Sequence, residues 1–335
     1  MLEVIKKLYA KEHLTLDESR AAMQTIMEGG ASEAQIAAYL TALAMKGATS
    51  DEITGAAMVM REKVTRIDAG DLTVVDTCGT GGSGHKLFNI STTAGLVAAG
   101  AGVRIAKHGN RGMTSSSGSS DVLEALGVNV NAGVPVVEEC IREAGFGFMF
   151  APLLHGAMKY AVPVRKQIGI RTVFNVLGPL TNPAGARRQV MGVFDVGLVT
   201  LLAEVLRKLG AEHALVVHGS DGLDEITLAV STKVAEVRPD GVKTYEIMPE
   251  DMGLAVRSLK SLYAESPQQS AEMVRRVLKG EAGPHRDIVL ANAAAAIYVA
   301  DEARNLMIGV EKAAESIDSG RAAHALARVI EITNA

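Results

Sequence analysis

The feature that most constrains the fold is a short apolar strand followed by a glycine-rich loop and the start of a helix. The strand is expected at Val74–Thr77, the loop contains Gly79-Thr-Gly-Gly82, and the helix opens around Asn89. Glycine backbones can approach phosphate oxygens closely, and a helix N-terminus directs unpaired N–H groups at the same point. This order predicts a phosphate-binding loop in an α/β fold, although a glycine loop alone is also common in turns that bind nothing.

A second unit of the same kind follows along the chain. The apolar strand Val103–Lys107 leads into Lys107-His-Gly-Asn-Arg111, and the hydroxyl-rich loop Thr114–Asp121 precedes a helix expected at Val122–Leu126. In open α/β sheets, ligands bind at the carboxyl ends of the strands. Both loops are therefore expected to face one crevice rather than to form a solvated basic edge and a linker.

A carboxylate pair lies far downstream in the sequence. Asp224 and Glu225 follow an apolar strand that ends near His218. Mg²⁺ prefers oxygen ligands and takes one or two carboxylates together with substrate phosphates. An Asp-Glu pair usually lies on the protein surface without binding a metal, but beside a diphosphate site it is a candidate magnesium site.

The pattern of elements indicates an α/β protein with a small N-terminal helical domain. Residues 1–70 are expected to form three helices, with Thr15 as one N-cap, a capping box at Ser32 and a third helix from Ser50. From Thr73 onward, strands alternate with helices, which is typical of a mostly parallel sheet covered on both faces. The expected strands are Val74–Thr77, Val103–Lys107, Phe146–Phe150, Val190–Val193 and His213–His218. The predicted domains are therefore 1–70 and 71–335.

The C-terminal part is expected to contain a short pair of strands and then helices. The strands lie within Thr227–Ile247 and turn at Pro239-Asp-Gly241. The expected helices are Ser270–Gly280, Arg286–Ala300 and Val310–Asn334, the last interrupted near Gly320.

Composition excludes several classes of protein. The 335 residues are 48% hydrophobic with mean hydropathy +0.18, and the most apolar stretches are too short to span a bilayer, so no membrane association is expected. The net charge of −4 and the 4% aromatic content argue against nucleic-acid binding. Two cysteines are too few for a disulfide scaffold, and no signal-peptide pattern opens the chain, so a cytoplasmic location is expected.

Seven motifs occur in an order that resembles the anthranilate phosphoribosyltransferase family, and the resemblance runs from end to end. They are Gly79-Thr-Gly-Gly82, Asn89-Ile-Ser-Thr92, Lys107-His-Gly-Asn-Arg111, Gly118-Ser-Ser-Asp-Val-Leu-Glu-Ala-Leu-Gly127, Pro163-Val-Arg165, Arg171-Thr-Val-Phe-Asn-Val-Leu-Gly-Pro-Leu-Thr-Asn-Pro183 and Gly222-Leu-Asp-Glu225. The resemblance implies a nucleoside phosphorylase/phosphoribosyltransferase-like fold and a homodimer. In each subunit, helices from about 163–182 join the small domain, and the active site lies at the hinge.

The reaction that the resemblance implies is Mg²⁺-dependent displacement of diphosphate from phosphoribosyl pyrophosphate by the amino group of anthranilate, a step of tryptophan biosynthesis. The amine is uncharged at neutral pH and already nucleophilic, so the protein needs to supply positioning and leaving-group stabilisation rather than a strong base. No catalytic acid or base is therefore assigned.

The resemblance also implies the site residues. Phosphoribosyl pyrophosphate would be held by Gly79, Gly82, Ser83, Leu87, Asn89, Ile90, Ser91, Thr92, Lys107, His108, Gly109, Asn110, Arg111, Ser115 and Ser119. Anthranilate would contact Gly79, Asn110 and Arg165, and Mg²⁺ would be held by Ser91, Asp224 and Glu225. Arg165 follows Pro163 at an expected helix start, where a cation is unfavourable, which favours a functional role for it, such as pairing with the carboxylate of the substrate.

The glycine loop departs from the family pattern at two positions. The family has an aspartate and a threonine where this chain has Ser83 and Leu87. Loss of one neutral hydrogen bond costs about 1 kcal/mol, so phosphoribosyl pyrophosphate is expected to bind atypically. Thr114 and Gly156 replace a serine and a proline of the family pattern.

Three alternatives remain open from the sequence. A pyrimidine nucleoside phosphorylase has a similar architecture but a differently ordered lysine–histidine–serine motif and no metal pair like Asp224-Glu225. A non-catalytic homologue that binds nucleic acid would fit the altered Ser83 and Leu87, but the acidic charge balance argues against it. A different aromatic acceptor is the third, because the acceptor pocket is defined mostly by shape.

Overall fold

The structure, a computed structural model, describes residues 1–82, 84–112 and 118–335. Within these ranges, no helix is both long enough and apolar enough to cross a membrane. Ser83, Thr114 and Ser115, which the sequence analysis singled out, lie outside the described residues.

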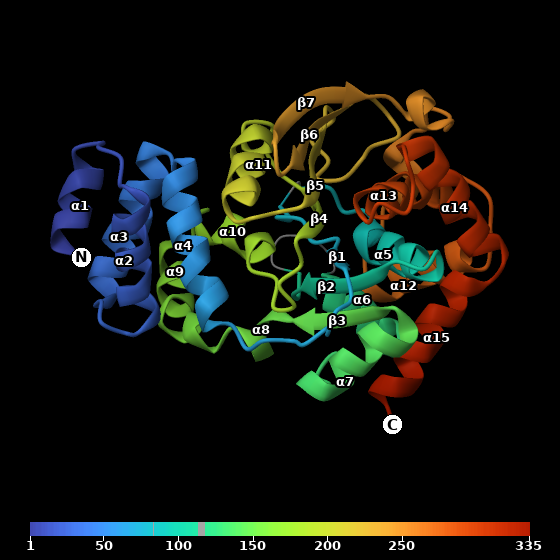
Figure 1. The fold of residues 1–335 in the computed structure, drawn as a ribbon, viewed down its shortest axis with the longest axis horizontal. Coiled ribbons are helices and arrows are strands. Elements are labelled where there is room, and N and C mark those ends of the chain that lie inside the picture. The colour runs from blue at the N-terminus through green and yellow to red at the C-terminus, as the bar shows by residue number, and fades with distance from the viewer. Residues whose placement is uncertain (83, 113–117) are drawn as a thin grey trace.

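Four helices form a bundle at the N-terminal end, seen in blue in Figure 1. They are α1 (Leu2–Tyr9), α2 (Leu16–Met27), α3 (Glu33–Lys46) and α4 (Ser50–Lys63). Capping boxes at Thr15, Ser32 and Thr49 begin α2, α3 and α4, so the two predicted N-terminal caps are confirmed. The expectation of three helices was wrong, because α1 precedes them. Close packing of α2 on α4 requires Gly55, since a Cβ there would lie 2.4 Å from the Leu16 carbonyl oxygen.

A seven-stranded sheet follows in the order β3-β2-β1-β4-β5-β6-β7. Its strands are β1 (Val74–Asp76), β2 (Arg104–Gly109), β3 (Phe146–Phe150), β4 (Arg188–Gly192), β5 (His213–Gly219), β6 (Thr232–Arg238) and β7 (Gly241–Ile247). β3, β2, β1, β4 and β5 are parallel, whereas β6 and β7 are antiparallel additions at one edge. The predicted mostly parallel sheet is confirmed.

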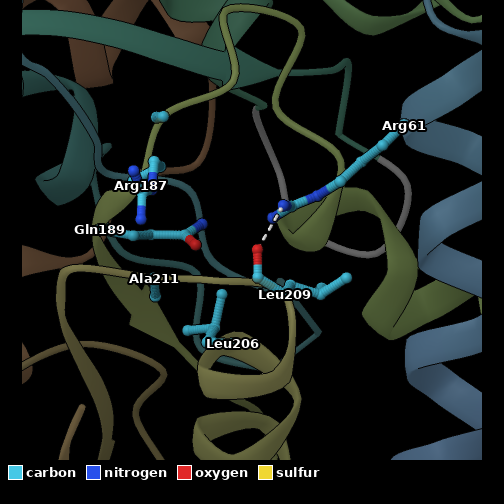
Figure 2. Close-up of a pocket in the computed structure, with 7 residues that line it drawn as sticks. Arg61, Arg187, Gln189, Leu206, Leu209 and Ala211 are labelled. Atoms are coloured by element: carbon cyan, nitrogen blue, oxygen red, sulfur yellow. Dashed lines mark hydrogen bonds between the residues drawn. The ribbon is translucent and has the colours of Figure 1, made fainter. Parts of the chain in front are cut away.

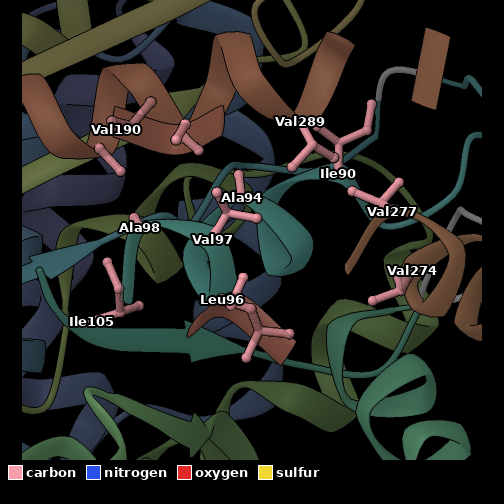
Figure 3. Packing of buried hydrophobic residues seen from close by; sticks show 14 of the residues in the cluster. Ile90, Ala94, Leu96, Val97, Ala98, Ile105, Val190, Val274, Val277 and Val289 are labelled. Atoms are coloured by element: carbon pink, nitrogen blue, oxygen red, sulfur yellow. The ribbon is translucent and has the colours of Figure 1, made fainter. Parts of the chain in front are cut away.

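Helices cover both faces of the sheet, as predicted. They are α5 (Ile90–Gly100), α6 (Ser119–Leu126), α7 (Val134–Glu139), α11 (Leu198–Lys208), α12 (Pro267–Leu278), α13 (Pro284–Val299), α14 (Leu306–Asp318) and α15 (Arg321–Thr333). Leu215 and Val217 pack with α5 and α13 in the main core, part of which Figure 3 shows, and Ala214 and Val216 pack with α11 on the opposite face. This alternation is the period of two expected of a buried strand. Gly320 separates α14 from α15 with φ +77°, at the predicted interruption.

The segment between β3 and β4 joins the bundle to the sheet. It contains α8 (Ala151–Leu154), α9 (Val162–Ile168), α10 (Phe174–Leu177) and two short 3₁₀ turns, Gly156–Tyr160 and Gly178–Leu180. Val164, Phe174 and Leu177 are buried in the same hydrophobic cluster as α2, α3 and α4.

Arg61 of α4 makes a polar link between the bundle and the rest of the chain. Its Nε donates to the Leu180 carbonyl at 2.6 Å and its Nη1 to the Leu209 carbonyl at 3.2 Å. Leu209 caps the C-terminus of α11, where a cation is favourable. Figure 2 shows this contact beside a cavity of about 10 Å³, room for about one water molecule. Burial, with a smaller effect of Arg66, lowers the pKa of Arg61 to about 10.

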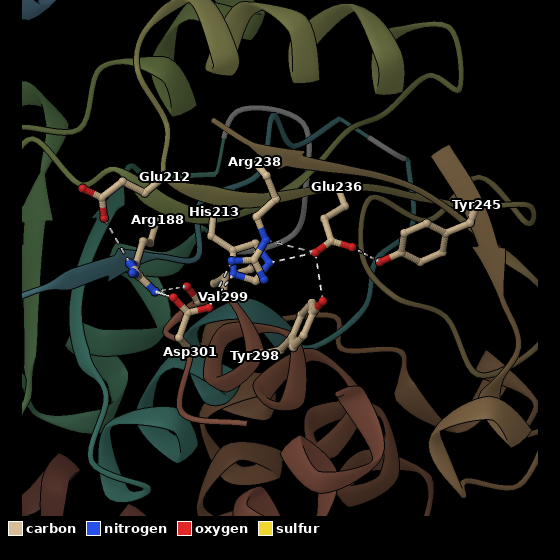
Figure 4. A network of polar contacts seen from close by, with 9 residues as sticks. All are labelled: Arg188, Glu212, His213, Glu236, Arg238, Tyr245, Tyr298, Val299 and Asp301. Carbon is tan, nitrogen blue, oxygen red and sulfur yellow. Dashed lines mark hydrogen bonds and ion pairs between the residues drawn. The ribbon is translucent and has the colours of Figure 1, made fainter. Parts of the chain in front are cut away.

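A polar network lies around the beginnings of β4 and β5 (Figure 4). His213 is buried between two carboxylates, with Nε2 3.1 Å from Glu236 Oε1 and Nδ1 3.2 Å from Asp301 Oδ1. Tyr298 and Tyr245 also donate their hydroxyls to Glu236, at 2.9 and 3.0 Å. The network therefore fastens β6 and β7 to α13 at the amino end of the parallel strands.

Candidate active site

The glycine loop leaves the carboxyl end of β1 and crosses the end of β4. The Thr80 N–H donates to the Gly192 carbonyl at 2.8 Å, and a Cβ on Gly79 would lie 3.0 Å from the same oxygen. Gly81 and Gly82 have φ of +63° and +86°, the left-handed region in which glycine is favoured. The sequence requirement for glycine here thus comes from close approach and backbone conformation.

The start of α5 carries the hydroxyls that the sequence analysis assigned to phosphate binding. Asn89 is the N-cap, and its Oδ1 accepts from the Thr92 N–H at 3.1 Å, so part of its polar capacity is used within the helix. The Thr92 hydroxyl is buried and has no hydrogen-bond partner among the described residues. The Ile90 side chain lies in the core, which leaves only its backbone for a ligand. An unpaired buried hydroxyl in the first helical turn suits an anionic ligand.

Lys107, in the second half of β2, is buried beside the start of α5. Its Nζ donates to the Thr77 carbonyl at 2.7 Å and to the Ser91 hydroxyl at 3.3 Å. The adjacent residue His108 donates its backbone N–H to Asp76 at 3.2 Å. Burial raises the pKa of Asp76 to about 6, although Asn182, Lys107 and His108 lower it. β1 and β2 thereby hold one cation at the base of the glycine loop.

The His108 ring lies in an ordered pair with His155. Its Nδ1 is 3.1 Å from the Gly178 carbonyl, which can only accept, so Nδ1 carries the proton. The Nε2 atoms of His108 and His155 are 3.1 Å apart, so His155 donates to neutral His108. Burial lowers the pKa of His108 to about 3 and that of His155 to about 4. His108 therefore packs toward the joining segment as a neutral ring.

Arg111 is half-exposed and pairs with carboxylates. Its guanidinium donates to Glu124 at 2.8 and 2.9 Å and to Asp121 at 3.1 Å, both on α6. Arg111 is thus paired within the protein, and its contact with phosphoribosyl pyrophosphate stays a prediction. Asn110 is exposed, and the Ser119 hydroxyl, on the first residue of α6, donates to its carbonyl at 3.4 Å. Gly109 must lack a side chain, since a Cβ would lie 2.2 Å from Ser119 Oγ.

The carboxylates Asp224 and Glu225 lie beyond the end of β5, next to the start of α5. Burial and the Asp224 carboxylate raise the pKa of Glu225, and Lys107 and hydrogen bonds with the Ser91 hydroxyl and backbone lower it. The structure therefore brings together Ser91, Lys107 and this carboxylate pair. The His85 ring, 3.2 Å from the Asp221 carbonyl, connects the glycine loop to the same segment.

These oxygen donors fit a divalent cation that also binds a ligand's phosphates. The described residues contain no group of three or more His, Cys, Asp or Glu able to hold a metal alone. Two like-charged carboxylates and a hydroxyl beside a phosphate-binding helix start are, however, the set that Mg²⁺ uses when substrate and water complete its shell.

Arg165 lies on α9, in the segment that joins the bundle. The helix begins at Val162 with Pro163 in its first turn, so the predicted helix start is confirmed. Because α9 has only seven residues, Arg165 also belongs to its last turn, where a cation is favourable, so the helix dipole gives no reason to assign it a function. Its guanidinium lies 5.1 Å from the centre of the Phe174 ring, and burial lowers its pKa. No carboxylate of the described residues forms an ion pair with it, unlike Arg111. A partly buried arginine without an anionic partner can accept a ligand carboxylate.

Three residues that position the site were not predicted from the sequence. Asn182 donates to Asp76 at 2.7 Å and to the Ala106 carbonyl at 2.9 Å. Asn292 of α13 accepts from the Ile226 N–H and donates to its carbonyl, both at 3.0 Å, directly after Glu225. Gly192 lies beneath both loops, in contact with Gly79 and Asp224. Asn182 belongs to the motif Arg171–Pro183, whereas no sequence pattern around Asn292 or Gly192 indicated a role at the site.

Comparison with known proteins agrees with this arrangement over the whole chain. Two family models match, the α/β domain of a glycosyl transferase family at residues 71–323 and its helical bundle domain at residues 2–64. An anthranilate phosphoribosyltransferase of Symbiobacterium thermophilum is 52% identical, covering 100% of this chain and 98% of the relative. The chain belongs to the anthranilate phosphoribosyltransferase family.

Solved structures of the family superpose closely on this chain. The anthranilate phosphoribosyltransferase of Thermus thermophilus is 43% identical with a TM-score of 0.94, covering 99% of each chain. The Saccharomyces cerevisiae enzyme in complex with phosphoribosyl pyrophosphate and Mg is 29% identical with a TM-score of 0.90, covering 99% of this chain and 97% of that one. The yeast enzyme is also known in complex with 4-fluoroanthranilate. The fold class and the family expected from the sequence are therefore confirmed.

Proposed function

We propose that this protein transfers the phosphoribosyl group of phosphoribosyl pyrophosphate to the amino group of anthranilate, as a step of tryptophan biosynthesis. In this reaction, the bond from C1 of the ribose to the diphosphate oxygen breaks with its electron pair, and a bond from C1 to the amine nitrogen forms. The observation that carries the proposal is the convergence of three loops: Lys107 donates to the Ser91 hydroxyl at the start of α5 at 3.3 Å, and Gly192 packs against both Gly79 of the glycine loop and Asp224.

The diphosphate end of the donor is assigned to the glycine loop and the start of α5. Gly79, Gly82, the backbone of residues 89–92 and the unpaired Thr92 hydroxyl are the donors available there. Lys107 supplies a positive charge at the base of this loop. Mg²⁺, held by Ser91, Asp224 and Glu225, would neutralise charge on the leaving diphosphate, and this charge stabilisation is the main catalytic contribution expected.

Anthranilate is assigned to the side of the joining segment. Arg165 offers an unpaired guanidinium to its carboxylate, and Gly79 and Asn110 border the same space by the family resemblance. Because α9 packs with the bundle while Lys107 belongs to the sheet, the proposed donor and acceptor sites belong to different parts of the chain. We therefore propose two domains, residues 1–70 with helices from about 163–182 and residues 71–335 otherwise, with the reaction at their hinge.

The protein is further proposed to form a homodimer through the N-terminal bundle. Three large apolar side chains of the bundle are unusually exposed. They are Leu2 (64%) and Tyr9 (86%), the first and last residues of α1, and Met45 (82%) of α3. Since α1 and α3 pack against each other, these side chains belong to one part of the bundle, and their burial in an interface would remove apolar surface from water. Light scattering is expected to give twice the mass of 35.1 kDa, and a Tyr9→Glu variant should shift toward the monomer. A monomeric wild type would contradict this assignment.

A cytoplasmic location is proposed from the cysteines. Cys78 and Cys140 are both unpaired, which is usual for proteins of a reducing compartment.

The function is tested by following the consumption of anthranilate together with the release of diphosphate. Purified protein with anthranilate, phosphoribosyl pyrophosphate and Mg²⁺ should consume anthranilate and release one diphosphate for each molecule consumed. Uridine or thymidine with inorganic phosphate should give no free base, which separates this activity from nucleoside phosphorolysis. Phosphorolysis without anthranilate consumption would refute the proposal, and turnover of another aromatic amine alone would refute the acceptor.

A further inference from the structure

Arg171 lies between α9 and α10 and reaches across to the glycine loop. Its Nη2 donates to the Gly82 carbonyl at 2.6 Å. Its guanidinium also lies over the Phe194 ring, 4.1 Å from the ring centre. Arg171 is the first residue of the motif Arg171–Pro183, and the two contacts give it a position beside the proposed donor site.

The two contacts close a ring of interactions around the loop. Phe194 follows β4, and its N–H donates to the Thr80 hydroxyl at 3.1 Å. Thr80 in turn donates its N–H to Gly192 at 2.8 Å. The loop is thus fixed to the end of β4 at Thr80 and, two residues later, to an arginine that stacks on the same strand extension.

The hydrogen bond to Gly82 matters because of the ligand that the loop is proposed to hold. A carbonyl oxygen directed at a diphosphate would repel it, whereas backbone N–H groups attract it. Gly81 and Gly82 lie in the left-handed region, where glycine has wide conformational freedom. A donor that holds the Gly82 carbonyl therefore selects one orientation of a peptide that could otherwise rotate.

Arg171 also connects the two halves of the site. It lies three residues after Ile168, the last residue of α9, and α9 carries Arg165. Its chain neighbour Thr172 donates its N–H to Asn175 at 2.9 Å, at the beginning of α10. The arginine thus belongs to the segment assigned to the acceptor, while its hydrogen bond holds the loop assigned to the donor.

We propose that Arg171 is a positioning residue that holds the glycine loop ready for phosphoribosyl pyrophosphate by binding the Gly82 carbonyl while stacked on Phe194. This inference rests on the proposed function. A guanidinium can stack and donate at the same time, whereas a lysine ammonium is a strongly hydrated point charge that cannot stack in the same way.

The test measures binding of Mg²⁺–phosphoribosyl pyrophosphate by calorimetry without any acceptor, together with steady-state kinetics. In Arg171→Gln, the dissociation constant and the KM for phosphoribosyl pyrophosphate should rise about tenfold, while the KM for anthranilate and the melting temperature stay near the wild-type values. Arg171→Lys should share most of this defect, and Phe194→Leu should reproduce it without a change of charge. Arg207→Gln, at an exposed arginine of α11 that pairs with Glu204, is the matched control and should bind normally.

Each outcome decides between positioning and charge. Full rescue by Arg171→Lys would overturn the proposal, because it would leave only a general electrostatic effect. Wild-type binding in both Arg171→Gln and Phe194→Leu would overturn it as well. A wild type that binds phosphoribosyl pyrophosphate but does not consume anthranilate would refute the proposed function and leave this inference valid. A wild type that neither binds phosphoribosyl pyrophosphate nor consumes anthranilate would refute both.

Discussion

Gly192 gives the sharpest test of how the two loops of the site fit together. It is buried at the end of β4, and a Cβ there would lie 1.7 Å from the Asp224 carbonyl oxygen. Since non-bonded heavy atoms prefer about 3.5 Å, the Asp224–Glu225 loop would have to move by more than about 1.5 Å in Gly192→Ala. Misplacement of catalytic groups by about 1 Å can cost about 10²-fold in rate.

The expected result of Gly192→Ala is a fall in kcat/KM of about 10²-fold or more, with a higher Mg²⁺ concentration for half-maximal rate. Overpacking costs about 1–3 kcal/mol, so the melting temperature should fall by only several degrees. The assay is the initial rate of anthranilate consumption over a Mg²⁺ titration, with thermal unfolding in parallel. Gly241→Ala is the control, because a Cβ there meets nothing within 4 Å.

Gly79→Ala should give a milder effect on the same assay. Its Cβ would lie 3.0 Å from the Gly192 carbonyl, so a shift of a few tenths of an ångström suffices. If Gly192→Ala folds and keeps the wild-type rate and Mg²⁺ dependence, the inferred tight contact between β4 and the carboxylate loop is refuted.

Three further predictions concern the altered loop and two paired carboxylates, Glu236 and Glu52. Leu87 packs at the edge of the main core and forms a β-bridge with Tyr263, so Leu87→Thr should cost about 1 kcal/mol of stability. The new hydroxyl should lower the KM for phosphoribosyl pyrophosphate several-fold, and an unchanged KM in steady-state kinetics would contradict this prediction. The hydrogen bond with His213, together with those from Tyr245 and Tyr298, outweighs burial and lowers the pKa of Glu236 from 4.5 to about 2. The ionised carboxylate therefore stabilises the fold by about 3 kcal/mol above pH 4.5, and this stabilisation is lost as the pH falls toward 2. Urea unfolding of Glu236→Gln should therefore differ from wild type at pH 7 and converge with it in acid, whereas a constant difference would contradict the assignment. Lys46 and Glu52 form a buried ion pair at 2.9 Å, so Lys46→Met should lower the unfolding free energy by about 3–5 kcal/mol, and a loss below about 1 kcal/mol by chemical denaturation would contradict it.

Local features of the fold could be predicted because their causes are local. The capping boxes at Thr15 and Ser32 act over three residues, and the β6–β7 turn at Gly241 follows from its own dipeptides. The strands of the parallel sheet were within two residues of their observed bounds, since runs of buried apolar residues are bounded by glycine and polar loops. Helix α1 was missed because it lacks a side-chain cap and is only eight residues long.

The site was only partly predictable, because its geometry depends on contacts between distant residues. Strand order places β4 beside β1, and only this neighbour relation brings Gly192 beneath Gly79 and Asp224. Arg111 stands within a motif that is predicted to bind phosphate, but its pairing with α6 depends on how that helix packs. Arg171 carries no local signal for its bond to Gly82, which spans 89 residues of the chain.

The most direct test of the account is the Mg²⁺ dependence of anthranilate consumption in the wild type and in Asp224→Asn combined with Glu225→Gln. The fluorescence of anthranilate should disappear in the wild type only when both phosphoribosyl pyrophosphate and Mg²⁺ are present. In the double variant, the rate at the same Mg²⁺ concentration should fall by about 10²-fold or more, since the carboxylates proposed to hold the metal are gone. A wild type that leaves anthranilate unchanged, or a double variant with wild-type rate and metal dependence, would contradict the account.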